Sequence, residues 1–96
     1  MKKINFYIGS NNQTKELESD KALEILSATY EGMNVSELVG YWKGEREKSL
    51  LVSVVCETVN YTEVKQVCRK LNSELDQQAI LVEVLDTTAL FITERI

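Results

Sequence analysis

The sequence predicts an α+β protein in which two helices cover one face of an antiparallel sheet. Two observations predict it. Segments of alternating hydrophobicity are separated by two segments whose apolar residues recur every three or four positions, and the order is strand, helix, strand, strand, helix, strand. A chain of 96 residues has the size of one small domain, which we assign to residues 1–96. A large enclosed chamber is not expected at this size.

The first expected strand spans residues 4–8, where Ile4, Phe6 and Ile8 share one face. The turn-forming stretch of residues 9–15 follows it directly. A polar loop is therefore expected between this strand and the first helix.

The first helix is expected to begin between residues 14 and 20, with Ser19 or its rival Thr14 as the N-cap. Its apolar stripe is carried by Ala22, Leu23, Leu26 and Tyr30. Gly32 is expected to end the helix, because glycine adopts the left-handed conformation without a steric penalty.

Two further strands are expected at residues 33–43 and 50–57. The charged segment of residues 44–48 joins them, and because it begins with Gly44 we interpret it as a hairpin connection. The later strand is apolar on both faces, which is typical of a strand in the middle of a sheet.

The second helix is expected to start at a capping box in which Asn60 takes the place of Ser or Thr and Glu63 is the third residue after it. A further strand is expected at residues 79–85. Residues 89–92 are expected to add a short extra C-terminal strand.

This order resembles the ferredoxin-like βαββαβ superfold over nearly the whole chain. P-II-type signalling proteins and ACT domains share the superfold and bind nucleotides or amino acids between subunits, and small dimeric α+β-barrel monooxygenases have a similar length and order. The chain carries no motif of these families. The spacing of Gly40 and Trp42, followed by Glu47 and Ser49, is similar to that in a family of small bacterial proteins of no assigned function. Because the superfold hosts unrelated activities, the resemblance implies an architecture and no particular chemistry.

Two of the expected strands are apolar on both faces, although two helices can cover only one face of a sheet. In the strand of residues 50–57 the two sets of alternate positions are Val52, Val54 and Cys56, and Leu51, Ser53 and Val55. In the strand of residues 79–85 they are Ile80, Val82 and Val84, and Leu81, Glu83 and Leu85. Large exposed apolar patches are rare on soluble monomers. The sequence therefore predicts self-association through the second face, most simply as a homodimer. The alternative is that residues 89–92 fold over part of it.

Composition excludes several classes of function. The 11 Lys and Arg residues against 15 Asp and Glu give a net charge of −4, which disfavours nucleic acid as a partner. There is no His, the usual general base near neutral pH and the commonest metal ligand, so neither a metal nor a cofactor is expected. Cys56 and Cys68 are expected to be free core thiols. No apolar run can span a bilayer and no signal peptide is recognisable, so we expect a cytoplasmic protein without a membrane partner.

The loop of residues 9–15 is a candidate site for a nucleotide or another anion, because backbone N–H groups between a strand and a helix can bind one. Its candidate ligand-binding residues are Asn11, Asn12, Thr14 and Lys15. The phosphate-binding glycine motifs are absent, and the alternative is a plain connecting loop.

A second candidate surface holds the one Trp of the chain. Tyr41, Trp42, Lys43 and Arg46 combine aromatic and basic side chains that could anchor a protein partner. The alternative is that Trp42 packs against the sheet. Glu83 is added to this set because it interrupts an apolar strand, and it must face solvent, pair with a base such as Arg46 or bind something.

These observations favour a non-enzymatic protein-binding module that forms a homodimer and acts through its sheet face or through the edge from Tyr41 to Arg46. Inhibition or regulation of another protein is one such role. The first alternative is a sensor or sponge for a small ligand, which would bind at the loop of residues 9–15 and a subunit interface. The second is an enzyme that uses Glu83 or a tyrosine without the help of His.

Overall fold

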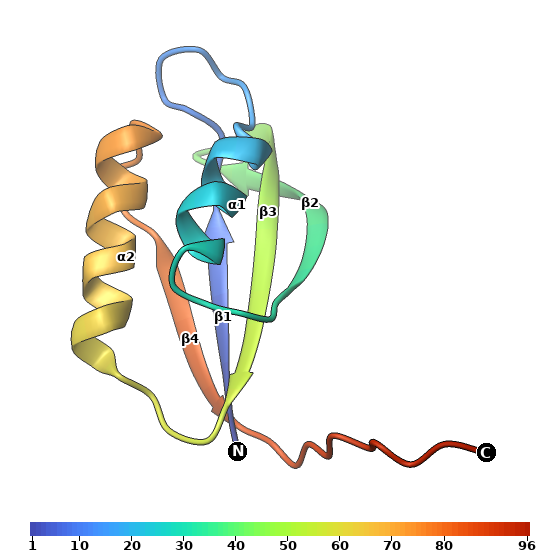
Figure 1. Ribbon diagram of the computed structural model, residues 1–96. Coiled ribbons are helices and arrows are strands. Elements are labelled where there is room, and N and C mark those ends of the chain that lie inside the picture. The colour runs from blue at the N-terminus through green and yellow to red at the C-terminus, as the bar shows by residue number, and fades with distance from the viewer.

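The computed structural model describes residues 1–96 and confirms the expected fold class (Figure 1). Its elements are β1 (Lys2–Ile8), α1 (Ser19–Ser27), β2 (Asn34–Trp42), β3 (Glu45–Cys56), α2 (Tyr61–Glu74) and β4 (Leu81–Asp86). The four strands form one sheet in the order β2-β3-β1-β4, and every neighbouring pair is antiparallel. Both helices lie on the same side of this sheet, which is the ferredoxin-like arrangement (Figure 1).

The core lies between the helices and one face of the sheet. Strand alternation sends every second side chain of β1 and β3 toward the helices, and the register sets Ile4 against Val54, and Phe6 against Val52. Phe6 and Val52 are fully buried, and Leu26 of α1 and Leu71 of α2 close over the same layer. The opposite face of the sheet has no helix on it.

The two helices start differently. The Asn60 side chain accepts a hydrogen bond from the Glu63 backbone N–H at 3.1 Å, which confirms the expected cap of α2. The expected cap of α1 is wrong by one residue: Ser19 is already helical, and Glu18 is the N-cap without a side-chain hydrogen bond. Gly32 does not end α1 either, because the helix stops at Ser27 and its carbonyls are met by ordinary right-handed turns rather than by a left-handed glycine.

The β2–β3 hairpin is longer than the sequence suggested. Its turn has only Lys43 and Gly44 between the strands, both with positive φ, 50° and 80°, as a two-residue hairpin turn requires. The expected charged connection of residues 44–48 is therefore mostly strand, since β3 begins at Glu45. β1 pairs with β3 only from Leu50 onward, so the far end of the hairpin projects as a two-stranded ribbon.

The expected extra strand at residues 89–92 is not formed. After β4, the Thr87 backbone N–H donates to the Met1 carbonyl at 3.1 Å, and no backbone hydrogen bond is made beyond it. The segment of residues 88–96, which we call the arm, passes the end of β3, where Leu90 and Phe91 line a groove with Val54 and Cys56, and then leads away from the sheet (Figure 1). The expected last strand also starts two residues late, at Leu81, because its pairing with β1 begins only there, opposite Tyr7. Neither helix is long and apolar enough to cross a bilayer.

Candidate functional site

The uncovered face of the sheet has aliphatic side chains at its corners. The register sets Lys3 of β1 between Val55 and Leu85, and Tyr7 between Leu51 and Leu81. Leu81 is 62% exposed and Leu85 is 43% exposed. The arm runs beside one corner of this face, where Leu90 and Phe91 line a groove with Val55, but it leaves Leu81 and Leu85 exposed. We call the uncovered side the open face.

A polar row crosses the middle of the open face. Ser53 donates to the Asn5 side-chain oxygen at 2.7 Å, and Tyr7 donates to Glu83 at 2.6 Å. Asn5 is only 7% exposed although no helix lies over it, because its neighbours in the sheet surround it. The hydrogen bond to Glu83 raises the pKa of Tyr7 above its ordinary value. The open face thus has aliphatic side chains at its four corners, with Lys3 between one pair of them, and side chains hydrogen-bonded to one another across its middle.

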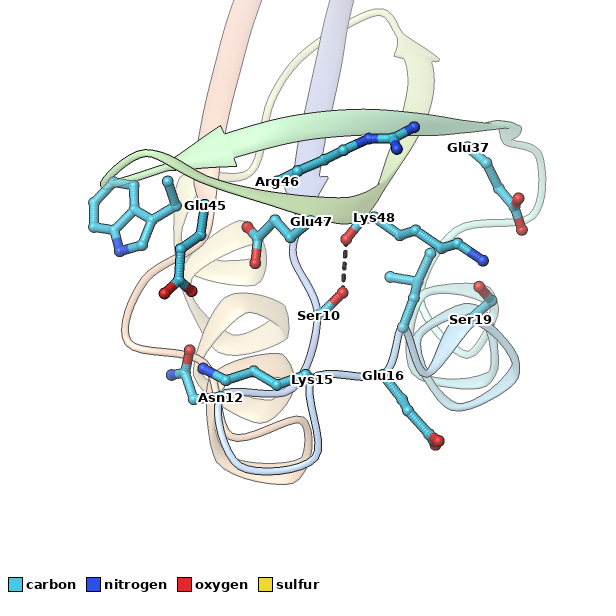
Figure 2. Close-up of a pocket in the computed structure, with 12 residues that line it drawn as sticks. Ser10, Asn12, Lys15, Glu16, Ser19, Glu37, Glu45, Arg46, Glu47 and Lys48 are labelled. Carbon is cyan, nitrogen blue, oxygen red and sulfur yellow. Dashed lines mark hydrogen bonds between the residues drawn. The ribbon is translucent and has the colours of Figure 1, made fainter.

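The second candidate site is a pocket of about 650 Å³ between the loop that follows β1 and the projecting hairpin (Figure 2). We call it the hairpin pocket. The residues that line it are Ser10, Asn12, Lys15, Glu16, Leu17, Ser19, Glu37, Trp42, Glu45, Arg46, Glu47 and Lys48.

Hydrogen bonds hold the loop side of the hairpin pocket in place. Buried Ser10 donates its hydroxyl proton to the Lys48 carbonyl at 2.7 Å, and its own carbonyl accepts from the Gln77 side-chain amide at 2.6 Å. Gly9 approaches the hairpin so closely that a Cβ there would lie 3.1 Å from Glu47 Oε1. The loop is therefore joined to both β3 and the turn after α2.

The hairpin pocket carries charges of both signs. Lys15, Arg46 and Lys48 contribute positive groups, while the carboxylates come from Glu16, Glu37, Glu45 and Glu47. No ion pair joins them, since the one ion pair of the structure is between Lys2 and Asp86. In Figure 2, Lys15 extends toward Asn12, and Arg46 and Lys48 both extend toward the side of the pocket where Glu37 lies. This mixture does not single out an anion as its ligand.

The structure divides the predicted ligand-binding residues into two pairs. Asn12 and Lys15 line the hairpin pocket. Asn11 and Thr14 do not, because they hold the loop together. The Asn11 side-chain oxygen accepts from the backbone N–H groups of Gln13 and Thr14, and the Thr14 hydroxyl accepts from that of Glu16.

The predicted partner-binding residues are also divided. Trp42 and Arg46 line the hairpin pocket, while Tyr41 is well exposed outside it. Lys43 is in the turn, with its ammonium 5.9 Å from the centre of the Trp42 ring. Glu83 belongs to the open face, where its partner is Tyr7 rather than Arg46. Trp42 does not pack into the sheet, since its side chain is largely exposed.

Sequence reasoning missed several residues of the hairpin pocket. Ser10 was within the predicted loop but carries no charge or aromatic ring to single it out. Glu47 and Lys48 were interpreted as a solvated connection, and Glu37 lies on a different strand. Only the register of β2 with β3 brings Glu37 near them, and no spacing in the sequence reveals that register.

The two cysteines are free and half-buried, and burial raises the pKa of the Cys68 thiol. No group of three or more His, Cys, Asp or Glu side chains is placed to hold a metal ion. In these two sites, the one side-chain hydroxyl that donates to a carboxylate is that of Tyr7, on Glu83.

Comparison with solved structures places the fold in a class of small α+β proteins. The chain is similar to a phage SAM lyase in its apo state, with a TM-score of 0.64 and 13% identity, over 88% of this chain and 78% of that one. It is also similar to a DUF3240 family protein from Shewanella baltica OS155, with a TM-score of 0.63 and 7% identity, over 97% of both chains.

At these identities the likeness shows a shared architecture and carries no residue-level correspondence. No protein-family model matches the chain, and no curated protein matches its sequence. The open face and the hairpin pocket are therefore the features of this chain that bear on its function.

Proposed function

We propose that the protein is a non-enzymatic interaction module that pairs with a second copy of itself through the open face. The observation that carries the proposal is the uncovered aliphatic surface at Leu51, Val55, Leu81 and Leu85. Contact with a matching face would remove these side chains from water, at about 25 cal/mol for each Å² of apolar area. A two-fold pair is the simplest assembly that covers the same face on both partners.

The polar row supports pairing of like faces. Ser53 donates to Asn5 and Tyr7 donates to Glu83, so each of these four side chains would enter an interface with one hydrogen bond already made. A buried polar group that lacks a partner would oppose association by about 1–3 kcal/mol.

The same row supports a non-enzymatic role. The hydrogen bond to Glu83 raises the pKa of Tyr7, so this phenol stays protonated at neutral pH and is a poor general base. The chain has no His, the side chain whose ordinary pKa lies closest to neutral pH.

Sedimentation velocity over a range of concentrations tests the proposal. We expect the native chain to sediment as a dimer, and Leu81→Glu to dissociate it by burying a carboxylate in the interface. Val39→Glu is the matched control, because Val39 is about as exposed but lies outside the open face. A native chain that stays monomeric at about 100 µM, a concentration at which a micromolar complex would form, contradicts the proposal.

A second candidate function is binding of a small ligand in the hairpin pocket. Its support is the convergence of Lys15, Arg46 and exposed Trp42 with the carboxylates of the hairpin. A ligand with an aromatic ring and charges of both signs fits these groups better than a simple anion does. The name of the similar phage protein adds SAM to the compounds to be tested.

Thermal unfolding in the presence of ATP or SAM tests this candidate. A ligand at a hundredfold excess over its Kd stabilises the folded chain by about 2.7 kcal/mol. Arg46→Ala should abolish the shift, while Arg69→Ala, on the exposed side of α2, should keep it. If neither compound raises the midpoint, this candidate fails for both. Turnover of SAM by the native chain would contradict the non-enzymatic proposal.

A further inference from the structure

The arm is apolar on both of its sides. Leu90, Phe91 and Ile92 are consecutive and exposed by 79%, 76% and 78%. In an extended chain, Leu90 and Ile92 point to one side and Phe91 to the other. A single surface of the same chain can cover only one of these sides.

One edge of the sheet has a stretch of unpaired backbone long enough for a short added strand. β2 pairs with β3 only as far as Ser53, so the backbone of residues 54–56 is paired with β1 on one side and has no strand on the other. Beside this edge lies an apolar groove of about 750 Å³, lined by Tyr30, Met33, Val54 and Cys56 among others. Unpaired strand edges of this kind accept an added strand.

We propose that the arm of one copy, over residues 89–92, adds as a short strand to the β3 edge at residues 54–56 of a second copy. The exchange is reciprocal, because each copy has one arm and one free edge. The proposal rests on the proposed function, since it names the element that fastens the two copies together. It also gives residues 89–92 the strand conformation that their sequence favours and that a single chain does not supply.

The direction of the arm favours a second copy over its own edge. The arm leaves from β4, crosses below the ends of the strands and passes its own β3 edge crosswise, without a backbone hydrogen bond to it (Figure 1). To lie along its own β3 edge it would have to turn sharply, and residues 87–96 contain no Gly, Pro or Asn at which to do so. The chain's own Leu90 and Phe91 form one wall of the groove, so an incoming arm would meet them there.

The groove is also continuous with the open face. Val55 lines the groove and is at the same time one of the aliphatic corners of that face. One pairing of two copies can therefore bury both surfaces together.

Sedimentation of arm and face variants separates this proposal from the proposed function. We expect the double variant Leu90→Ser/Phe91→Ser to weaken dimerisation at least about tenfold, as loss of central apolar contacts does. Thr93→Ser/Glu94→Ser is the matched control in the same arm. Circular dichroism checks the fold of each variant, which the arm should not affect because it lies outside the core.

The outcomes are distinct. Dissociation by the arm variant supports the arm, whether or not Leu81→Glu also dissociates the dimer. A dimer that Leu81→Glu breaks and the arm variant does not overturns the arm and leaves the open-face proposal standing. A monomeric native chain overturns both.

Disulfide trapping locates the docking site. In a Cys68→Ala background, Leu90→Cys or Phe91→Cys is oxidised with copper phenanthroline and run on a non-reducing gel. The two positions point to opposite sides, so one of them shares a side with Cys56. We expect a covalent dimer that disappears when Cys56→Ser is added. An internal disulfide within one chain, or a cross-link independent of Cys56, overturns the proposal.

Discussion

The two faces of the sheet are built from the same strands and behave oppositely. On the covered face, Ile4, Phe6 and Val52 are packed under two helices and almost no surface remains. On the open face, Asn5 and Tyr7 alternate with these same residues, and the aliphatic side chains at the corners remain in contact with water. Strand alternation distributes apolar residues to both faces, but the chain supplies helices for only one.

This difference separates stability from association. A side chain on the covered face contributes to the folding of one copy, whereas one on the open face contributes mainly when a second copy is present. Substitutions on the covered face should therefore lower the unfolding free energy of a single copy, whereas substitutions on the open face should weaken association.

The largest effect is expected from Phe6→Ala on the covered face. Phe6 is fully buried against Tyr30, with ring centres 5.7 Å apart, so its removal leaves a cavity and should cost about 3–5 kcal/mol of unfolding free energy. Leu81→Ala, on the open face, should cost less than about 1 kcal/mol in a monomeric preparation. Urea denaturation at low protein concentration measures both, and equal losses would contradict the contrast between the faces.

Much of the fold could be predicted from the sequence because its signals are local. Alternation in β1 and the stripe of α2 each lie within one element, and Asn60 caps the helix that directly follows it. The errors fall where local signals compete. Glu45 to Lys48 look like a loop, yet pairing with β2 keeps them in β3. Residues 89–92 look like a strand, yet they make no backbone hydrogen bond to any strand of the same chain.

The sites were less predictable, because each depends on residues that are far apart in the chain. Lys15 and Arg46 were chosen separately from their own segments, and only the hairpin's projection over the loop brings them into one pocket. Glu83 stood out by interrupting an apolar strand, but its partner Tyr7 is set by the register of β1 with β4. Sequence spacing carries no information on either contact.

The next effect concerns the helix that covers the buried face. Asn60→Ala removes the oxygen that accepts the Glu63 backbone N–H at the start of α2, and should lower the unfolding free energy by about 1 kcal/mol. Ser19→Ala is the matched control, since Ser19 is inside α1 and provides no cap. Thermal unfolding of both variants should show a loss for Asn60→Ala alone.

Tyr30→Phe should act in the opposite direction. The Tyr30 hydroxyl is buried at the margin of the covered face without a hydrogen-bond partner, so its removal should stabilise the chain by about 1 kcal/mol. Burial, aided by the Glu63 carboxylate, raises the pKa of Tyr30 to about 12. The pKa of Tyr30 is higher in the folded chain than the unfolded value of 10.0. The unfolding free energy is therefore independent of this ionisation below pH 10, and it falls as the pH rises from 10 toward 12.

The advantage of Tyr30→Phe should therefore widen between pH 10 and about 12. Denaturant midpoints of the two proteins at pH 8 and across this range measure it. Tyr41→Phe is the control, because Tyr41 is exposed on β2 and no burial acts on it. A difference that stays constant with pH would show that Tyr30 ionises in the folded state as readily as in the unfolded chain.

The smallest effect is expected at the rim shared by both faces, where Lys2 of β1 and Asp86 of β4 form an exposed ion pair. The Lys2 ammonium holds the pKa of Asp86 below its ordinary value of 3.8. The ion pair therefore stabilises the folded chain fully above pH 3.8, and this stabilisation is lost as the pH falls through the lowered pKa of Asp86. Asp86→Asn should lower the melting temperature slightly at pH 7 in dilute buffer. The loss should shrink as the pH falls below 3.8, and it should vanish in about 1 M salt, where the Debye length is about 3 Å. Glu57→Gln, an exposed carboxylate outside any ion pair, should show neither dependence. A salt-insensitive loss for Asp86→Asn would mean that the carboxylate acts through packing at the rim, and the rim would then belong with the covered face.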